Sequence, residues 1–169
     1  MAELIAKTAA EGLLPLTIGR MTLAEPDWQP ITSIATLSGY GGPALPEPGR
    51  SGTLQEAPVI WTGRNQWFVI GDVDLPAGLA VTDQSDAWCR VVLSGADVEA
   101  VLARLTPLDT NPAVFKPGRV SRTLVGHMNA ILWRRSRDTV EIFAFRSMAK
   151  TLVHELERAM RGVVARAAL

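Results

Sequence analysis

The stretch from Thr82 to Val163 constrains the fold of this 169-residue chain more than any other part of it. A strand-like run, a helix, a loop rich in Pro, Asp and Asn, further strand-like runs and a long amphipathic helix follow one another there. Consecutive strands joined by short connections pair antiparallel. We therefore predict an α+β fold, with an antiparallel or mixed β-sheet and helices packed on it.

Two segments have the hydrophobic period of an amphipathic helix. Apolar residues at i, i+3, i+4 and i+7 predict a helix over 98–105, and Ser94 with Asp97 resembles a capping box in front of it. A second helix is predicted from about Ser147 to Arg161, with Ser147 as its N-cap. Its buried stripe is expected to consist of Met148, Leu152, Val153, Leu156 and Met160.

Runs of β-branched and aromatic residues predict the strands. They lie at 16–23, 31–37, 59–62, 67–70, 79–81, 88–93, 120–125, 130–133 and 139–145. Residues 63–66 read as the connection of a hairpin. The Gly- and Pro-rich segment 39–55 is expected to be a loop, and a loop of that length is usually mobile or functional.

The length of the chain favours one domain. A chain of about 150 residues buries roughly 70% of its unfolded surface, which is enough for a sizeable core. We predict a single domain over 1–169, in which 1–30 form an N-terminal arm or edge element. Residues 31–81 would then form a first half and 82–169 a second half.

Composition argues against nucleic acid and membranes as partners. Seventeen Lys and Arg residues balance 17 Asp and Glu residues, so no global field would hold a polyanion or an acidic membrane surface. No apolar run reaches the roughly 20 residues of a spanning helix, and a signal-peptide layout is missing, so we expect a cytoplasmic protein. Cys89 alone can form no internal disulfide, and its strand-like surroundings predict a buried thiol.

The chain offers few candidates for chemistry. Residues 39–44 fit the relaxed dinucleotide pattern G-x-G-x-x-A, but nearby prolines oppose the helix that such a site needs, so a plain loop is favoured. His154 begins an H-E-x-x-H-like motif whose second ligand position is Arg158, and His127 lies in an expected turn without metal-ligand spacing around it. We predict no catalytic, cofactor-binding or metal-ligating residue in this chain.

Three further groups of residues have ordinary structural interpretations. Asp83, Ser85 and Asp86 favour a turn over a catalytic acid pair. Tryptophans in predicted strands are expected to pack in the core, although an exposed one could anchor a partner. Arginines in the second half could contact phosphate or carboxylate groups, or form a solvated face or a protein interface. They are Arg119, Arg122, Arg134, Arg135, Arg137 and Arg146.

Three groups of residues in the second half are specific when taken together. They are Pro107-Leu108-Asp109 with Pro112 and Phe115, then Gly118 with Thr123, and finally Arg146-Ser147 at the start of the last helix. With these motifs the chain resembles the gamma subunit of heterotetrameric sarcosine oxidase. The hairpin IWTGRNQWFVIG extends the likeness to about two-thirds of the chain, whereas 39–55 departs from the family pattern in being short and rich in Pro and Gly.

The resemblance implies a small subunit of a bacterial flavoenzyme. Such an enzyme oxidatively demethylates sarcosine to glycine, produces hydrogen peroxide and passes the one-carbon unit to tetrahydrofolate. The implied partners are the alpha, beta and delta subunits, which carry FAD, FMN, NAD and zinc, whereas the gamma subunit carries no cofactor. The implied fold is like the folate-binding fold of the glycine-cleavage T-protein, the aminomethyltransferase.

The leading hypothesis is therefore a non-catalytic assembly subunit that docks through the loop 107–118. The candidate interface residues are Pro107, Leu108, Asp109, Pro112, Phe115 and Arg146. The alternative, suggested by fold analogy alone, is a stand-alone folate-binding protein or a one-carbon (aminomethyl) transferase. An isolated subunit would also be expected to form a homo-oligomer through its uncovered apolar patch.

Overall fold

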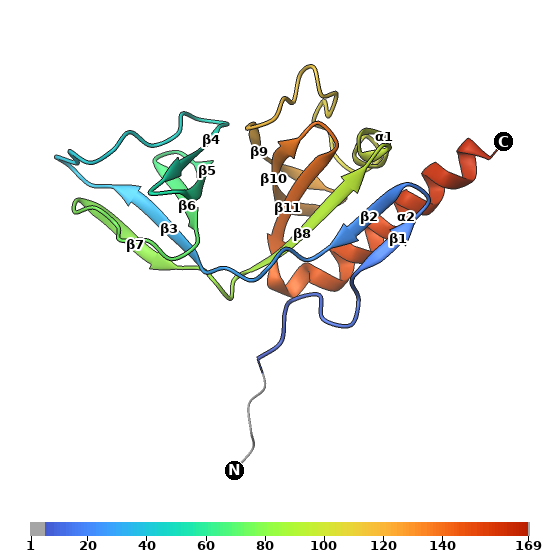
Figure 1. Ribbon diagram of the computed structural model, residues 1–169, viewed down its shortest axis with the longest axis horizontal. Coiled ribbons are helices and arrows are strands. Elements are labelled where there is room, and N and C mark those ends of the chain that lie inside the picture. The colour runs from blue at the N-terminus through green and yellow to red at the C-terminus, as the bar shows by residue number, and fades with distance from the viewer. Residues whose placement is uncertain (1–5, 169) are drawn as a thin grey trace, which may run out of the picture.

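Residues 6–168 are described by a computed structural model, in which eleven strands form two antiparallel sheets (Figure 1). The larger sheet has the order β1-β2-β8-β11-β10-β9 and the smaller one β4-β5-β6-β3-β7. The larger sheet contains β1 (Leu16–Ile18), β2 (Met21–Ala24), β8 (Trp88–Gly95), β9 (Val120–Val125), β10 (Met128–Ser136) and β11 (Thr139–Phe145). The smaller contains β3 (Ile31–Thr36), β4 (Ser51–Leu54), β5 (Ala57–Gly63), β6 (Gln66–Ile70) and β7 (Leu79–Asp83).

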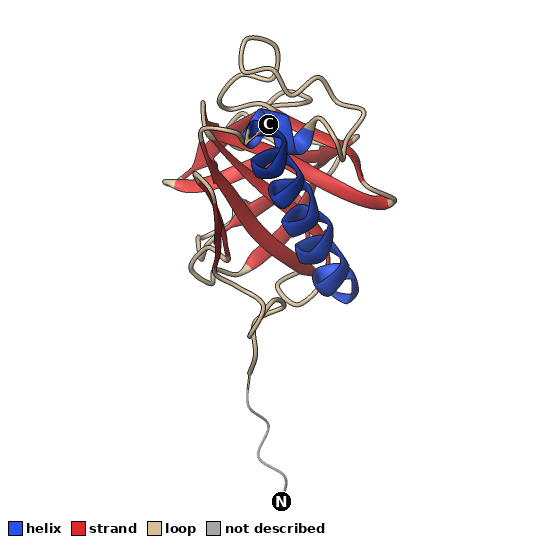
Figure 2. Cartoon of the chain, turned by 90° about the vertical axis from the view of Figure 1, so that its right-hand side faces the viewer, coloured by secondary structure: helices blue, strands red, loops and turns tan. Residues whose placement is uncertain are grey.

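The helices pack on one face of the larger sheet, which confirms the predicted α+β fold. They are α1 (Val98–Leu102), the 3₁₀ turn η1 (Arg146–Met148) and α2 (Ala149–Ala167). Figure 2 shows α2 lying across the strands. Leu152 and Leu156 of α2 join Val101 of α1, Val91 of β8 and Leu132 of β10 in one buried cluster. Burial of each such side chain contributes roughly 1.5–3 kcal/mol, so this cluster holds the helices in place.

The opposite face of the larger sheet packs against the smaller sheet. Because side chains alternate along a strand, the neighbours of the helix-facing residues point away from the helices. Ile131, Trp133 and Phe143 on this inner face cluster with Ile60 and Phe68 of the smaller sheet. The two sheets therefore share a second apolar core.

Main-chain hydrogen bonds also join the two sheets at one corner. The Ser51 amide donates to the Gly118 carbonyl and the Val120 amide donates to the Gly49 carbonyl, each at 2.9 Å. These bonds connect the edge strand β4 of the smaller sheet to the edge strand β9 of the larger one.

Most predicted strands are present, but three details of the prediction are wrong. Residues 16–23 are a hairpin and not one strand, because Gly19 at φ +60° turns the chain between β1 and β2. β4 lies inside the predicted loop 39–55, where pairing with β5 makes a strand of a polar segment. The β5–β6 connection consists of two residues, 64–65, with Asn65 at positive φ.

The predicted helix caps are also wrong. Ser94 belongs to β8, where it pairs with Thr22 and Thr139, and Asp97 makes no side-chain capping bond to α1. At the last helix Arg146–Met148 form a 3₁₀ turn, so Met148 is the N-cap and is exposed, and Ser147 is not the cap. The remaining four residues of the predicted stripe, Leu152, Val153, Leu156 and Met160, are buried as expected. None of the helices described within residues 6–168 is long and apolar enough to cross a membrane.

Gly95 should be intolerant of any side chain. A Cβ at Gly95 would lie 2.1 Å from the Arg20 carbonyl oxygen and 2.9 Å from the Met21 Cα, and its φ is +124°. We expect Gly95→Ala to lower the free energy of unfolding in urea by at least about 2 kcal/mol, because β2 must move away from β8.

Gly162→Ala is the matched control for Gly95→Ala. Gly162 lies in α2, and nothing lies within 4 Å of the position of its Cβ. Alanine there should stabilise the helix by about 0.5–1 kcal/mol. Similar effects of the two substitutions would contradict the close approach of β2 to β8.

Candidate functional site

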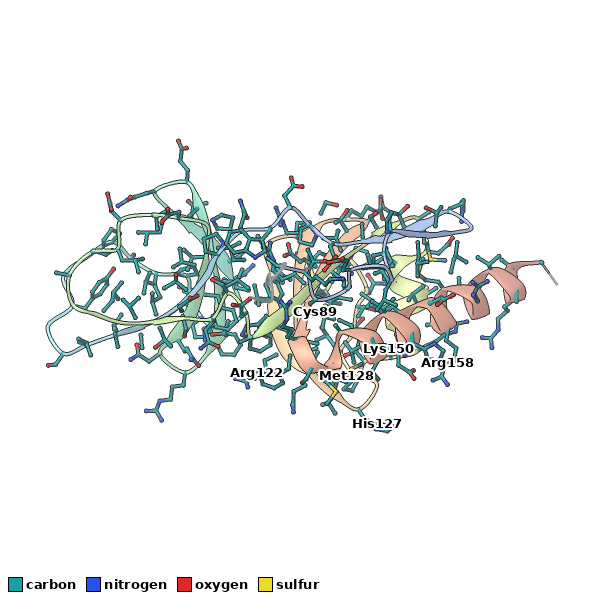
Figure 3. All side chains as sticks on the ribbon, turned by 90° about the horizontal axis from the view of Figure 1, so that it is seen from below. Cys89, Arg122, His127, Met128, Lys150 and Arg158 are labelled. Atoms are coloured by element: carbon teal, nitrogen blue, oxygen red, sulfur yellow. The ribbon has the colours of Figure 1, made fainter. Side chains whose placement is uncertain are left out.

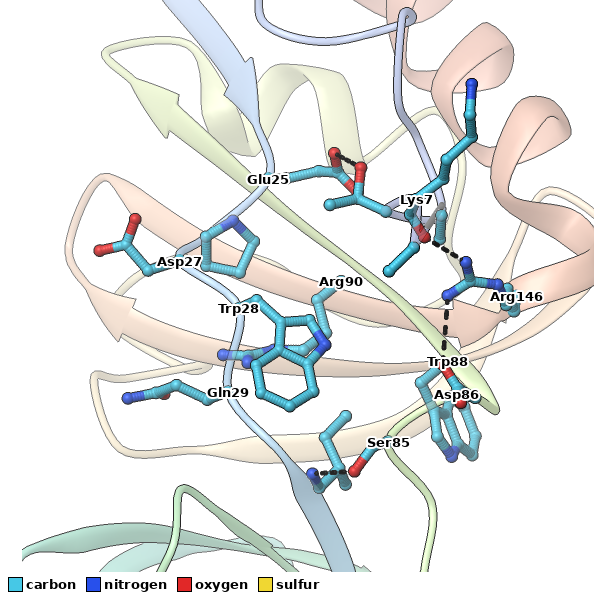
Figure 4. A pocket seen from close by; sticks show the side chains of 15 residues that line it. Lys7, Glu25, Asp27, Trp28, Gln29, Ser85, Asp86, Trp88, Arg90 and Arg146 are labelled. Carbon is cyan, nitrogen blue, oxygen red and sulfur yellow. Dashed lines mark hydrogen bonds and ion pairs between the residues drawn. The ribbon is translucent and has the colours of Figure 1, made fainter. Parts of the chain in front are cut away.

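Two linkers cross where the sheets meet, and a hollow of about 510 Å³ lies beside them (Figure 4). Residues 25–30 lead from β2 to β3, and residues 84–87 lead from β7 to β8. The Gln84 amide donates to the Ile31 carbonyl at 2.8 Å, and the Ile31 amide donates to the Ser85 hydroxyl at 3.1 Å. These bonds tie the linkers together and position the wall of the hollow.

The predicted turn at Asp83, Ser85 and Asp86 is confirmed. The Asp83 carboxylate accepts hydrogen bonds from the Ser85 hydroxyl at 2.6 Å and the Ser85 amide at 2.9 Å. The hydroxyl and then the amide of Ser85 lower the pKa of the Asp83 carboxyl from its ordinary value. Asp83 and Ser85 thus hold the start of a linker in shape.

Two tryptophan side chains are among the residues that line the hollow. Trp28 is 70% exposed on the first linker. Trp88 lines the hollow from β8, stacks on Phe145 at 4.8 Å between ring centroids and meets the Phe68 ring edge-on at 5.3 Å. Phe145 is itself 45% exposed. Exposed aromatic rings beside a concave surface are typical of protein interfaces.

Arg146 lies at the edge of this hollow (Figure 4). Its guanidinium donates a hydrogen bond to the Lys7 carbonyl and approaches the Asp86 carboxylate at 3.8 Å. The first contact attaches the N-terminal segment to the start of η1. Asp86 is almost fully exposed, so the second contact is weak.

A buried carboxylate with two arginines lies behind the hollow. Glu141 on β11 is fully buried, and its two oxygens accept hydrogen bonds from Arg90 at 2.7 Å and from Arg135 at 2.6 Å. Arg90 also lines the hollow, and the Arg135 guanidinium lies 4.0 Å above the Trp133 ring. Glu141 therefore fixes the positions of the Arg90 and Arg135 guanidinium groups on the inner face of the larger sheet.

Replacing Glu141 should destabilise the fold strongly. Glu141→Gln leaves two guanidinium groups without their counter-charge, and the side chain of Arg90 is only 9% exposed. Breaking one partner of a buried pair costs about 3–5 kcal/mol. Urea unfolding would measure this loss.

Glu157→Gln is the control for this substitution. Glu157 pairs with Arg161 on the outer surface of α2 at 2.7 Å, where both partners reach solvent. We expect a change of less than about 0.5 kcal/mol, because exposed pairs contribute little. A similarly small effect of Glu141→Gln would contradict the role of the triad.

The predicted docking loop runs from α1 to β9, and Phe115 holds it from inside. Phe115 is 5% exposed and packs 5.5 Å from the guanidinium of Arg134, which is fully buried. Arg134 also donates to the Thr110 carbonyl at 2.7 Å. Burial lowers the pKa of the Arg134 guanidinium from its ordinary value. Of the candidate interface residues, Pro107 and Asp109 are exposed, whereas Leu108 and Pro112 are partly buried.

The structure does not bring all candidate interface residues together. In Figure 1 the loop 103–119 lies at the top and η1, which begins with Arg146, at the bottom. Trp28 and Glu141 are not among the residues predicted for an interface or a site. Two sequence features could have pointed to them. Trp28 is an aromatic residue in the Pro-rich linker 25–30, and Glu141 is an acidic residue inside the apolar strand β11. Contact of the loop with a partner remains a prediction.

Other sequence patterns lie away from the hollow. Residues 39–44 form part of an irregular loop with no helix behind it. His127 lies in the turn between β9 and β10 as expected, and His154 is exposed on α2. Among residues 6–168, no three His, Cys, Asp or Glu side chains gather in a way that could hold a metal ion.

The Cys89 thiol should be unreactive in the folded chain. Cys89 is fully buried, and burial, with a smaller contribution from the Glu25 carboxylate, raises the pKa of its thiol to about 12. Thiolate is the reactive form, so Ellman's reagent at about pH 8 should label Cys89 only after denaturation. Rapid labelling of the native chain would contradict this.

A solved structure reproduces this fold over nearly the whole chain. It is a chain of the heterotetrameric sarcosine oxidase from Corynebacterium sp. U-96, solved in complex with pyrrole 2-carboxylate. The match has a TM-score of 0.77 at 20% sequence identity and covers 92% of this chain and 94% of that one. The chain has the fold of a sarcosine oxidase subunit. No protein-family model and no curated protein sequence matches the chain.

Proposed function

We propose that this chain is the gamma subunit of a heterotetrameric sarcosine oxidase and that it stabilises the assembly without taking part in catalysis. Its partners would be the alpha, beta and delta subunits, in the cytoplasm. FAD, FMN, NAD, tetrahydrofolate and zinc would be bound by those partners and not by this chain.

The observation that carries the proposal is the length of the structural match. The likeness spans 92% of this chain and 94% of the chain from the oxidase, so the shared fold accounts for nearly all of both chains. A shared fold is weak support for a shared catalytic activity, because an activity depends on a few site residues. An assembly role depends instead on the shape of the whole subunit, which the shared fold describes. The match in full extent therefore supports a role in assembly.

The surface around the linkers supports the same role. The hollow beside the linkers, called the first hollow below, is lined by Trp28 and Trp88, and Trp88 stacks on Phe145. The three aromatic side chains therefore follow one another along this surface. We call these three residues the aromatic strip. Trp and Arg are enriched at the energetic centres of interfaces, and Arg146 lies at the edge of this strip.

Placing a charge on the aromatic strip should weaken the assembly. A tagged chain recovered from its native cells, grown on a methylated glycine, is expected to bring down two larger subunits with flavin absorbance. Trp28→Glu and Phe145→Glu together should lower that recovery at least about tenfold, because a charge would replace a buried anchor. Val164→Glu on α2 is the control, since Val164 is also an exposed apolar residue.

The predicted docking loop needs a variant of its own. Asp109→Lys reverses an exposed charge of the loop without touching Phe115, so the fold should persist. Recovery of the larger subunits should fall if the loop is part of the interface. Unchanged recovery with both sets of variants would contradict the proposed assembly role.

A folate-binding or aminomethyl-transferring role is the second candidate, favoured by the first hollow. About 510 Å³ is within the range of small-molecule sites, and Arg90 and Arg146 line it. Saturating tetrahydrofolate should then raise the melting temperature of the purified chain. The tagged chain could instead be recovered without flavin absorbance and without partner subunits, and be stabilised by tetrahydrofolate. That result would favour the folate-binding role over the assembly role.

A further inference from the structure

Arg50 and Arg119 lie directly opposite each other where the edges of the two sheets meet, beside β4 and β9 in Figure 1. They form an antiparallel bridge, and the two main-chain hydrogen bonds that join the sheets at this corner lie on either side of it. The two arginines are therefore a non-hydrogen-bonded pair, the arrangement in which facing Cα atoms are closest, about 4.5 Å apart. Their side chains start side by side.

Both side chains point out of the space between the sheets. Ser51 and Val120 are the next residues along each strand, and both face the shared core. The Trp133 indole donates to the Ser51 hydroxyl at 3.0 Å, and Val120 packs in the apolar cluster between the sheets. Because successive side chains alternate, Arg50 and Arg119 face outward. Arg50 is exposed and Arg119 is half-buried.

Neither arginine has a counter-charge within residues 6–168. No carboxylate described there lies within ion-pair distance of either guanidinium. Glu47 is close in sequence, but it contributes its carbonyl, which accepts from the Arg50 amide at 3.0 Å. Like charges directly opposite each other in an antiparallel pair are unfavourable. The backbone thus holds two cations together without an ion pair to offset their repulsion.

A third cation, Lys116, belongs to the same corner. The Arg119 amide donates to the Lys116 carbonyl at 3.0 Å, so a tight turn keeps the exposed lysine close to the bridge. This turn lies at the end of the predicted docking loop, directly after the buried Phe115. The Arg119 carbonyl accepts from the Arg134 amide at 3.0 Å, which fixes the other end of the turn. We call Arg50, Lys116 and Arg119 the basic corner.

The shape and charge of the basic corner favour a protein as its partner. None of its residues lines the first hollow, and its side chains point outward, so a small anion bound there would stay in water. An ion pair in water contributes little. A protein surface would cover the corner and exclude water from it. The equal numbers of acidic and basic residues in the whole chain disfavour nucleic acid and anionic membranes.

We propose that the basic corner docks an acidic segment of a partner subunit. A carboxylate of that segment bridges Arg50 and Arg119, and a neighbouring carboxylate pairs with Lys116. The repulsion between the two arginines is then present in the free chain and relieved in the assembly. This inference rests on the proposed assembly role, to which it adds the chemistry of the partner's surface.

Carbodiimide cross-linking of the recovered complex tests that chemistry. The reagent joins an amine to a carboxylate in contact with it and leaves no spacer. The lysines of the chain are Lys7, Lys116 and Lys150, and Figure 3 shows Lys150 on the part of the molecule that carries α2. Mass spectrometry should find Lys116 joined to an Asp or Glu of a larger subunit, and Arg119→Lys should add a cross-link at position 119. A recovered complex without a cross-link at either position would overturn the proposal.

Removal of the facing pair tests its role in docking. Arg50→Gln with Arg119→Gln should lower recovery of the larger subunits at least about tenfold, because charge pairs at an interface are lost. The melting temperature of the free chain should rise at low salt, and rise less at high salt, where the repulsion is already screened. Lys150→Gln with Arg166→Gln is the matched control, since it removes the same charge from exposed positions on α2. Its recovery should equal that of the unmodified chain.

Two results with the double variant would contradict the proposal. Unchanged recovery of the larger subunits would exclude the basic corner from docking. A lower melting temperature together with lower recovery would make the two arginines part of the fold and not of an interface. Failure of the assembly role is distinguishable from both, because the unmodified chain itself would then recover no larger subunit.

Discussion

The inner face of the larger sheet, centred on Ile131, Trp133 and Phe143, must be removed from water, and the smaller sheet covers it. Because α2 already occupies the other face, the smaller sheet can pack only on this side. The linkers at 25–30 and 84–87 must then cross at the junction. The hollow beside the linkers and the aromatic strip lie where this packing leaves space, so the proposed partner surface results from the way the two sheets pack.

The Glu141 triad has a specific place in this arrangement. Two guanidinium groups next to an apolar core would repel each other and lose hydration without a counter-charge. Glu141 accepts from both, which lets Arg90 line a hollow and lets Arg135 lie over Trp133. A hydrophobic residue at 141 would leave both arginines without a counter-charge and release them from their positions. The triad thus both stabilises the junction and determines where its two guanidinium groups lie.

Sequence reasoning predicted those elements whose pattern is local. The strands at 31–37, 88–93 and 139–145 and the buried stripe of α2 follow from alternation and from the helical period. β4 could not be predicted, because Ser51-Gly52-Thr53-Leu54 becomes a strand only through pairing with β5. The 510 Å³ hollow depends on two linkers distant in sequence, and no local pattern predicts that they meet. Ser94 and Ser147 were predicted as caps because serine is a common helix cap. Short polar residues also occur in strands and 3₁₀ turns, so the residue type alone does not identify a cap.

The pairing of β2 with β8 has a consequence for how the chain is made. Met21 lies opposite Gly95, so the N-terminal hairpin finds its neighbour only after the whole smaller sheet has been synthesised. β8 in turn pairs with β11, and the helix-facing side of the larger sheet is covered by α2, which is synthesised after all of the strands described. Topologies dominated by such distant contacts fold slowly and expose apolar strands while they wait. A nascent chain of this kind therefore exposes apolar strand surface until α2 has been synthesised.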